Sequence, residues 1–283
     1  MWHLEHIPKL AHFYWGNDTV SYLRYLAVFS FKKLNPDWKI KLYVPKYRYT
    51  GAKTWGTSEH SGRFSGPDYT GKLENLGLER VEIDFSHFGI DNMIPETFKA
   101  DFLRWYLLST SGGLWSDFDI IYFQPIEALY LNQTGYRALD TTICLQAENG
   151  GYYHSIGFLL SSAGNPYYKF ISGQTYGMLD LGDYQSIGSR IPNLYFPNAL
   201  LIRDRFPGIN LENLSPDVVY PINYAMVPYI FHTPYMHYLT DQTIGLHWFA
   251  GHPESCKFEN LLNDDSLAGY NNIISQVIRR VIA

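Results

Sequence analysis

The sequence predicts an α/β fold in which a mixed, mostly parallel sheet is flanked by helices, with additional loops and helices around it. Short apolar runs alternate with longer amphipathic stretches in the first part of the chain, and this strand–helix–strand order is typical of parallel sheets with crossover helices. Hydrophobic residues make up 46% of the 283 positions, enough for a sizeable core. We expect a single domain over residues 1–283.

In the first part of the chain, the spacing of apolar residues and the positions of helix-ending residues predict the helices and strands. A stripe at helical spacing runs over residues 22–34, after cap residues at 17–19, and ends at Asn35-Pro36. Three short runs with apolar or alternating residues predict strands. The expected strands are at 11–15, 39–44 and 80–84. Residues 46–72 are rich in Gly, Ser, Thr and Tyr without any period, and we interpret them as an insertion beside the functional site.

The later part of the chain is read in the same way. Apolar runs predict strands at 142–146 and 156–161, and longer stripes predict helices at 166–183 and 267–282. The last helix carries a narrow apolar stripe, which indicates packing on the core. No internal repeat is evident.

The central stretch, Pro95 to Pro125, carries the strongest chemical signal. Pro95 is suited to a helix start and Gly112-Gly113 to its end, so a helix is expected over 97–108. A buried strand at Leu114-Trp115 then leads to Asp117 and Asp119. Alternation along a strand would point both carboxylates to the same side. Two negative charges held that close repel each other, which indicates a bound cation.

The same helix carries Asp101 and Arg104, which are three residues apart and therefore share one face. Two interpretations are open. The pair is a surface ion pair that contributes about 0.3–0.5 kcal/mol, or it binds a ligand beside the two carboxylates. Asp-x-Asp alone is a weak motif, whereas Asp-x-x-Arg, Gly-Gly, an aromatic residue and Asp-x-Asp in sequence form a specific pattern.

That pattern, ADFLRWYLLSTSGGLWSDFD, resembles the donor-site core of glycosyltransferases with a DxD motif. The similar families are those of the yeast initiating α-1,6-mannosyltransferase, the α-1,4-galactosyltransferases and the glucosyltransferase domains of large clostridial toxins. Three further stretches resemble the first strand, the late strand segment and the C-terminal His-Trp segment of these families, in the same order. They are IPKLAHFYWGND, LSPDVVYPI (Leu214–Ile222) and IGLHWFAGHPES (Ile244–Ser255).

The resemblance implies a GT-A (Rossmann-like) fold, with a nucleotide and donor half at about 1–125 and an acceptor half with a closing segment at about 126–283. It implies transfer of a sugar from a nucleotide-diphosphate sugar, UDP- or GDP-linked, to a glycan or other hydroxyl acceptor with retention. Mn²⁺, or Mg²⁺, is the expected cofactor. Asp119 is the implied metal ligand, with Asp117 beside it and His247 completing the site.

The other donor contacts also come from the resemblance. Trp15 and Tyr14 lie where relatives hold the base, and Asp101 and Arg104 match residues that read the sugar and phosphate. Trp15 as an ordinary core aromatic is the alternative. Relatives retain anomeric configuration, by front-face attack or through a covalent intermediate that needs a carboxylate. Glu148 is the candidate carboxylate, and a solvated loop residue is its alternative.

Composition limits the remaining functions. The net charge of −5 does not favour nucleic acid as a partner. Two cysteines argue against a disulfide scaffold, and without a signal peptide or long apolar span we expect a cytoplasmic protein with no membrane span. The alternatives to a glycosyltransferase are a non-catalytic sugar-binding module on the same fold and a sugar transferase acting on modified DNA bases.

Overall fold

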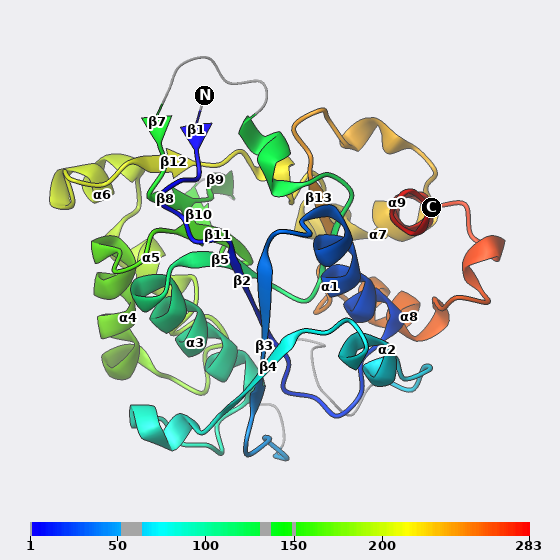
Figure 1. Cartoon of the computed structure of the whole chain (residues 1–283), viewed down its shortest axis with the longest axis horizontal. Helices are drawn as coiled ribbons and strands as arrows, with labels where there is room; N and C mark the ends of the chain where they lie inside the picture. The colour runs from blue at the N-terminus through cyan, green and yellow to red at the C-terminus, as the bar shows by residue number, and fades with distance from the viewer. Residues whose placement is uncertain (1, 52–63, 131–136, 149–150) are drawn as a thin grey trace.

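Seven strands form the central sheet, in the order β12-β8-β11-β5-β2-β3-β4. Neighbouring strands are parallel except at β11, which runs antiparallel to both β5 and β8. The structure, a computed structural model, describes residues 2–51, 64–130, 137–148 and 151–283 (Figure 1). The predicted fold class, a mixed and mostly parallel sheet flanked by helices, is confirmed.

The strands of this sheet are Leu10–Tyr14 (β2), Lys39–Pro45 (β3), Glu79–Ile83 (β4), Gly113–Ser116 (β5), Thr141–Ile143 (β8), Phe158–Ser161 (β11) and Leu211–Asn213 (β12). Three strand pairs lie beside it: Trp2–His3 (β1) with Arg137–Ala138 (β7), Ile120–Tyr122 (β6) with Gly245–His247 (β13), and Leu145–Glu148 (β9) with Gly151–His154 (β10). The α-helices are Tyr22–Leu34 (α1), Thr70–Glu74 (α2), Glu96–Thr110 (α3), Pro166–Met178 (α4), Arg190–Tyr195 (α5), Ala199–Arg205 (α6), Val227–His232 (α7), Pro253–Leu261 (α8) and Ile273–Ile282 (α9).

The two faces of the sheet are covered by different helices, as the alternation along β2 requires. Phe13 packs in one core with Phe31 of α1, and its neighbour Tyr14 packs in another with Phe98 of α3. Helix α4 lies against α3, whereas α7, α8 and α9 gather on the α1 side (Figure 1). The central strands are thus buried on both sides, and the functional site must lie at their ends.

The junction between α3 and β5 depends on its two glycines. Gly112 has φ 66° and Gly113 has φ 96°, in the left-handed region that favours glycine. A Cβ at Gly113 would lie 2.2 Å from the carbonyl oxygen of Leu10, so β5 approaches β2 more closely than any side chain permits. The predicted end of the helix at Gly112-Gly113 is confirmed. The turn sets the direction of β5 and so the place of the two aspartates that follow it.

Several predicted elements in the second half were wrong in their bounds. Residues 142–146 do not form one strand, because the chain leaves the main sheet after Ile143 and starts β9 at Leu145. The helix predicted over 166–183 ends at Met178. The helix predicted over 267–282 starts at Ile273, because Asn272 caps it in a capping box with Ser275.

The stretch Leu214–Ile222 was expected to be a late strand, but it forms a 3-10 turn at Pro216–Val218. Its backbone is nevertheless bonded to the segment around β13, since the Ile244 and His247 amides donate to the Val218 and Val219 carbonyls. The insertion predicted at 46–72 contains the start of α2, and residues 52–63 lie outside the described part of the chain.

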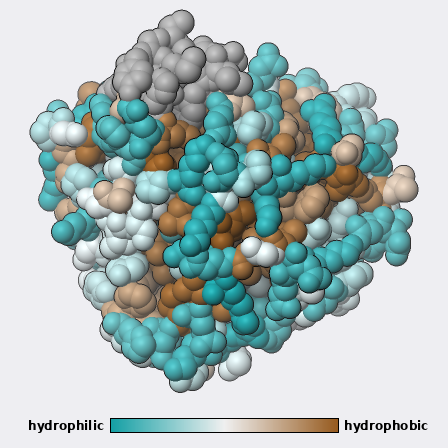
Figure 2. All heavy atoms as spheres, viewed as in Figure 1, coloured by the Kyte–Doolittle hydropathy of each residue, from teal (hydrophilic) through white to brown (hydrophobic). Residues whose placement is uncertain are grey.

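Hydrophobic residues appear between hydrophilic ones over the middle of the face seen in Figure 2. This mixture is usual for a folded domain, whose surface always includes apolar atoms. Within the described residues, no helix is both long and apolar enough to cross a membrane.

Candidate functional site

A cavity of about 600 Å³ opens at the ends of β2 and β5, and its size is typical of a small-ligand site. Side chains from α3, from the turn after β5 and from the loop after β13 share its wall. All the candidate residues whose side chains the structure describes line it. These are Tyr14, Trp15, Asp101, Arg104, Asp117, Asp119 and His247.

Asp117 and Asp119 are close together, but not for the reason predicted. The strand β5 ends at Ser116, and the Asp-Phe-Asp segment is a turn between β5 and β6. The strand alternation expected to align the two carboxylates is therefore wrong, because neither aspartate lies in a strand. Phe118 packs into the core below the turn, which leaves both carboxylates at the cavity.

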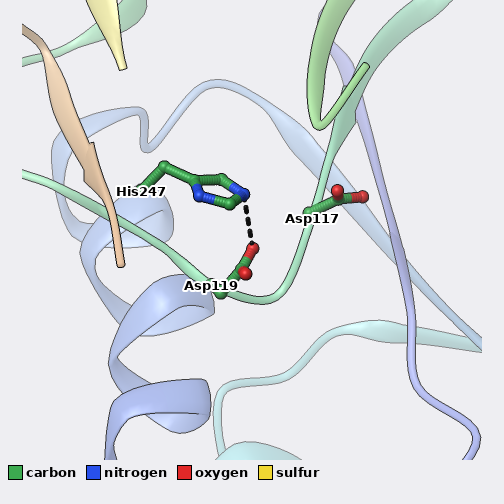
Figure 3. Close-up of side chains that lie close together, drawn as sticks. All are labelled: Asp117, Asp119 and His247. Atoms are coloured by element: carbon green, nitrogen blue, oxygen red, sulfur yellow. Dashed lines mark ion pairs between the residues drawn. The ribbon is translucent and has the colours of Figure 1, made fainter. Parts of the chain in front are cut away.

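His247 joins them through the pairing of β13 with β6. In this antiparallel pair His247 lies opposite Ile120, the residue directly after Asp119. Nε2 of His247 lies 3.1 Å from Oδ1 of Asp119. Figure 3 shows these two side chains turned toward one another, with the Asp117 carboxylate to one side of them. Ligand atoms of all three residues lie within 4.8 Å of one another.

The loop after β13 wraps around Asp119. The Ala250 amide donates to Oδ2 of Asp119 at 2.9 Å, and the Trp248 amide donates to its main-chain carbonyl at 2.9 Å. Phe249 between them has φ 49°, a left-handed conformation that costs a bulky residue about 1–3 kcal/mol. Burial by itself would raise the pKa of the Asp119 carboxyl. His247 and the Ala250 amide lower this pKa by more than burial raises it, so the carboxylate stays ionised.

These residues fit a hard divalent cation. Two carboxylates and an imidazole are a suitable set for Mn²⁺ or Mg²⁺, with the imidazole favouring Mn²⁺. Oδ1 of Asp119 is buried and faces Nε2 of His247 at 3.1 Å without an aligned hydrogen bond, so a cation held between these two atoms would be a partner for both. Nδ1 of His247 accepts weakly from the Phe249 amide at 3.3 Å. A metal bound at Nε2 would need the imidazole proton on Nδ1, and this weak contact with the Phe249 amide would then have to open.

Arg104 is buried and connects the aspartates of the helix and the turn. Its Nη1 lies 2.9 Å from Oδ1 of Asp101, and its Nη2 donates to Oδ1 of Asp117 at 2.9 Å. Only 5% of its side chain is exposed, so the interpretation as a surface ion pair is wrong. Trp115 also donates to Oδ1 of Asp117, at 2.7 Å. These contacts use one oxygen of Asp117 and direct the other, Oδ2, toward Gly157.

Trp15 and Tyr14 lie at another side of the cavity. The Trp15 ring packs at 5.1 Å from the Phe118 ring, and the Arg24 guanidinium lies 4.8 Å from its centre. The Tyr14 hydroxyl donates to Glu96, the first residue of α3. Tyr14 therefore shapes the wall through Glu96 rather than presenting its hydroxyl to the cavity.

Glu148 ends β9, and its side chain lies outside what the structure describes, so its predicted role stays a prediction. Gln146, two residues earlier, does line the cavity.

Among the cavity residues that sequence reasoning missed are Glu96, Glu259 and Tyr220. Glu259 of α8 accepts from Arg24 at 2.9 Å and so connects α8 to α1. None of the three belongs to a motif, and only Tyr220, inside the stretch Leu214–Ile222, carried any signal.

The comparisons with known proteins place the chain beside glycosyltransferase structures. No family model and no curated protein matches it. Solved structures do match. One described as PaToxG glycosyltransferase shares 15% identity at TM-score 0.43, over 71% of this chain and 75% of the other. The galactosyltransferase LgtC, in complex with donor and acceptor sugar analogues, shares 14% identity at TM-score 0.38, over 92% and 100%.

A third, the glycosyltransferase GlyE of Streptococcus pneumoniae, shares 13% identity at TM-score 0.46, over 98% of this chain and 61% of the other. These identities lie below 25% and the TM-scores below 0.5. The residues of the cavity, and not these likenesses, therefore carry the functional argument.

Proposed function

We propose that the protein is a metal-assisted glycosyltransferase that moves a sugar from a UDP- or GDP-linked donor to a glycan or other hydroxyl acceptor. The observation that carries this proposal is the cluster of Asp117, Asp119 and His247 in one cavity with the buried Arg104. A diphosphate leaving group requires neutralisation of its charge in this way. The sequence pattern around the cluster supports the same activity.

Each part of the cavity has a separate task. Asp119 and His247 would hold the cation, with Asp117 beside them, and the cation would stabilise charge on the departing diphosphate as a Lewis acid. Asp101 would accept hydrogen bonds from sugar hydroxyls. Arg104, whose Nε makes no hydrogen bond in the protein, would donate to a sugar or phosphate oxygen. Trp15 and the backbone near Tyr14 would hold the base.

The proposal includes retention of anomeric configuration, as implied by the sequence resemblance. A front-face attack depends on positioning and charge stabilisation, whereas a covalent route needs a carboxylate, for which Glu148 is the candidate. NMR of the product decides this point through its anomeric coupling, since a β-linkage from an α-donor contradicts retention.

The test is a screen of UDP- and GDP-sugars for release of free sugar in the presence of Mn²⁺. We expect hydrolysis of at least one donor, loss of activity in excess chelator, and a loss of 10²-fold or more in Asp119→Asn. The control is Asp37→Asn, which changes an aspartate in an exposed ion pair with Lys9 and should keep full activity. Binding of nucleotide sugar without any turnover would indicate a sugar-binding module instead. Full activity in chelator would exclude the metal.

A further inference from the structure

The hydroxyl of Tyr220 is buried at the cavity wall without a hydrogen-bond partner. The residue is 7% exposed and its hydroxyl oxygen makes no hydrogen bond in the protein. Tyr220 also lines the cavity that contains the carboxylates. Buried hydroxyls in folded proteins nearly always have a partner, and a missing partner calls for an explanation such as a bound ligand.

Tyr220 lies next to the residues of the cation cluster. The ring centre of Tyr220 lies 5.0 Å from that of His247. A Cβ built on Gly157 would lie 3.0 Å from the Tyr220 hydroxyl and 2.7 Å from Oδ2 of Asp117. The Tyr220 ring therefore packs beside His247, and its hydroxyl and Oδ2 of Asp117 both face Gly157 at the edge of the cation cluster.

The backbone holds Tyr220 firmly there. Its amide donates to the Pro216 carbonyl at 2.6 Å, and the preceding Val219 carbonyl accepts from the His247 amide at 2.7 Å. Tyr220 and His247 are thus placed by the same pair of segments. Phenylalanine would fill the same space without leaving a polar atom unpaired, so packing alone does not explain the hydroxyl.

Other buried polar atoms without an aligned hydrogen bond surround the same cavity, although Nη1 of Arg104 and Oδ1 of Asp119 lie in ion pairs. Among the described residues, more than half of the buried side-chain atoms without a hydrogen bond belong to residues that line it. They are Oγ1 of Thr97, Nε and Nη1 of Arg104, Oδ1 of Asp119, Oγ of Ser189 and the hydroxyl of Tyr220. The set contains both donors and acceptors, as a ligand with a cation and anionic oxygens requires.

We infer that Tyr220 is a donor-binding residue whose hydroxyl donates a hydrogen bond to a phosphate oxygen of the nucleotide diphosphate held at Asp117, Asp119 and His247. This inference rests on the proposed function. It adds a neutral hydroxyl donor next to the carboxylates, the guanidinium and the imidazole of the site. A neutral hydroxyl can approach a phosphate oxygen beside Asp117 without adding negative charge.

The experiment compares two tyrosine-to-phenylalanine variants by calorimetric binding of UDP and of GDP, each with Mn²⁺, and by thermal unfolding. Tyr220→Phe removes the unpaired hydroxyl. Tyr168→Phe removes a fully buried hydroxyl that donates to the Thr142 carbonyl and lies outside the cavity wall, so it is the matched control.

We expect Tyr220→Phe to weaken nucleotide binding by about 10- to 100-fold, the loss of one hydrogen bond to a charged group. Its Tm should stay equal or rise, because an unpaired buried hydroxyl is removed. Tyr168→Phe should keep wild-type affinity and lose about 2–4 °C in Tm.

Three results overturn the inference. Unchanged nucleotide affinity in Tyr220→Phe excludes the contact. A drop in its Tm as large as that of Tyr168→Phe shows that the hydroxyl has a partner within the protein. A wild-type protein that binds neither nucleotide contradicts the proposed function itself, and this outcome is recognised before any variant is compared.

Discussion

Replacing Arg104 by alanine should destabilise the protein far more than the loss of an ordinary ion pair. The guanidinium contacts Asp101 and Asp117 at 2.9 Å each, and its side chain is only 5% exposed. It also lies 5.1 Å from the centre of the Trp115 ring. Its removal would leave two carboxylates near each other without a cation, one 12% and the other 29% exposed.

The magnitude follows from burial. Breaking a buried ion pair by removing one partner costs about 3–5 kcal/mol, whereas an exposed pair contributes about 0.2–1 kcal/mol. Because water reaches part of Asp117, we expect a value near the lower end, about 3 kcal/mol. This is a large part of the free energy of unfolding of a typical domain.

Urea unfolding followed by tryptophan fluorescence measures the effect. The control is Arg190→Ala, since Arg190 pairs with Asp183 at 2.7 Å but is 56% exposed, and we expect it to lose at most about 1 kcal/mol. The double variant Arg104→Ala/Asp117→Asn should recover part of the loss, because it removes one stranded charge. Equal losses in Arg104→Ala and Arg190→Ala would refute this reasoning.

Two further predictions concern histidines. His247→Ala should raise the Mn²⁺ concentration for half-maximal activity about 10-fold or more, while His252→Ala in the same loop should not; an unchanged requirement together with a large loss of Tm would make His247 structural. Burial lowers the pKa of His12 to about 4, whereas an unfolded histidine titrates near 6.5. The unfolded chain therefore binds the proton first, and the free energy of unfolding should fall between pH 6.5 and 4, by up to about 1.4 kcal/mol per pH unit. Denaturant titrations at several pH values check this, and an unchanged slope in His12→Gln would contradict it.

The central stretch was the most predictable part of the fold. Helix α3, the glycine turn and β5 follow one another without a break, and each is specified by local signals: a helical period, two glycines and a short apolar run. Local signals were weaker later in the chain. The break before α9 was missed because the apolar stripe continues across it, while the Asn272 cap decides where the helix starts.

The candidate site was also predictable from the sequence only in part. Asp117 and Asp119 could be found from sequence because they stand two residues apart. The orientation of their carboxylates could not, since it depends on a turn and on Phe118 packing into the core. Whether Arg104 formed a surface or a buried pair was equally open, because burial depends on elements that pack over it.

The sequence by itself determined the α/β class, the α3–β5 unit and the residue types that suit a cation and a charged ligand, because these depend on neighbours within a few positions. Only the tertiary structure decided that His247 lies opposite Ile120 and that Ala250 donates to Asp119 across 131 residues. The same packing left the Tyr220 hydroxyl unpaired beside them. Contacts of this kind form where β13 pairs with β6, and no local pattern specifies which distant segments will pair.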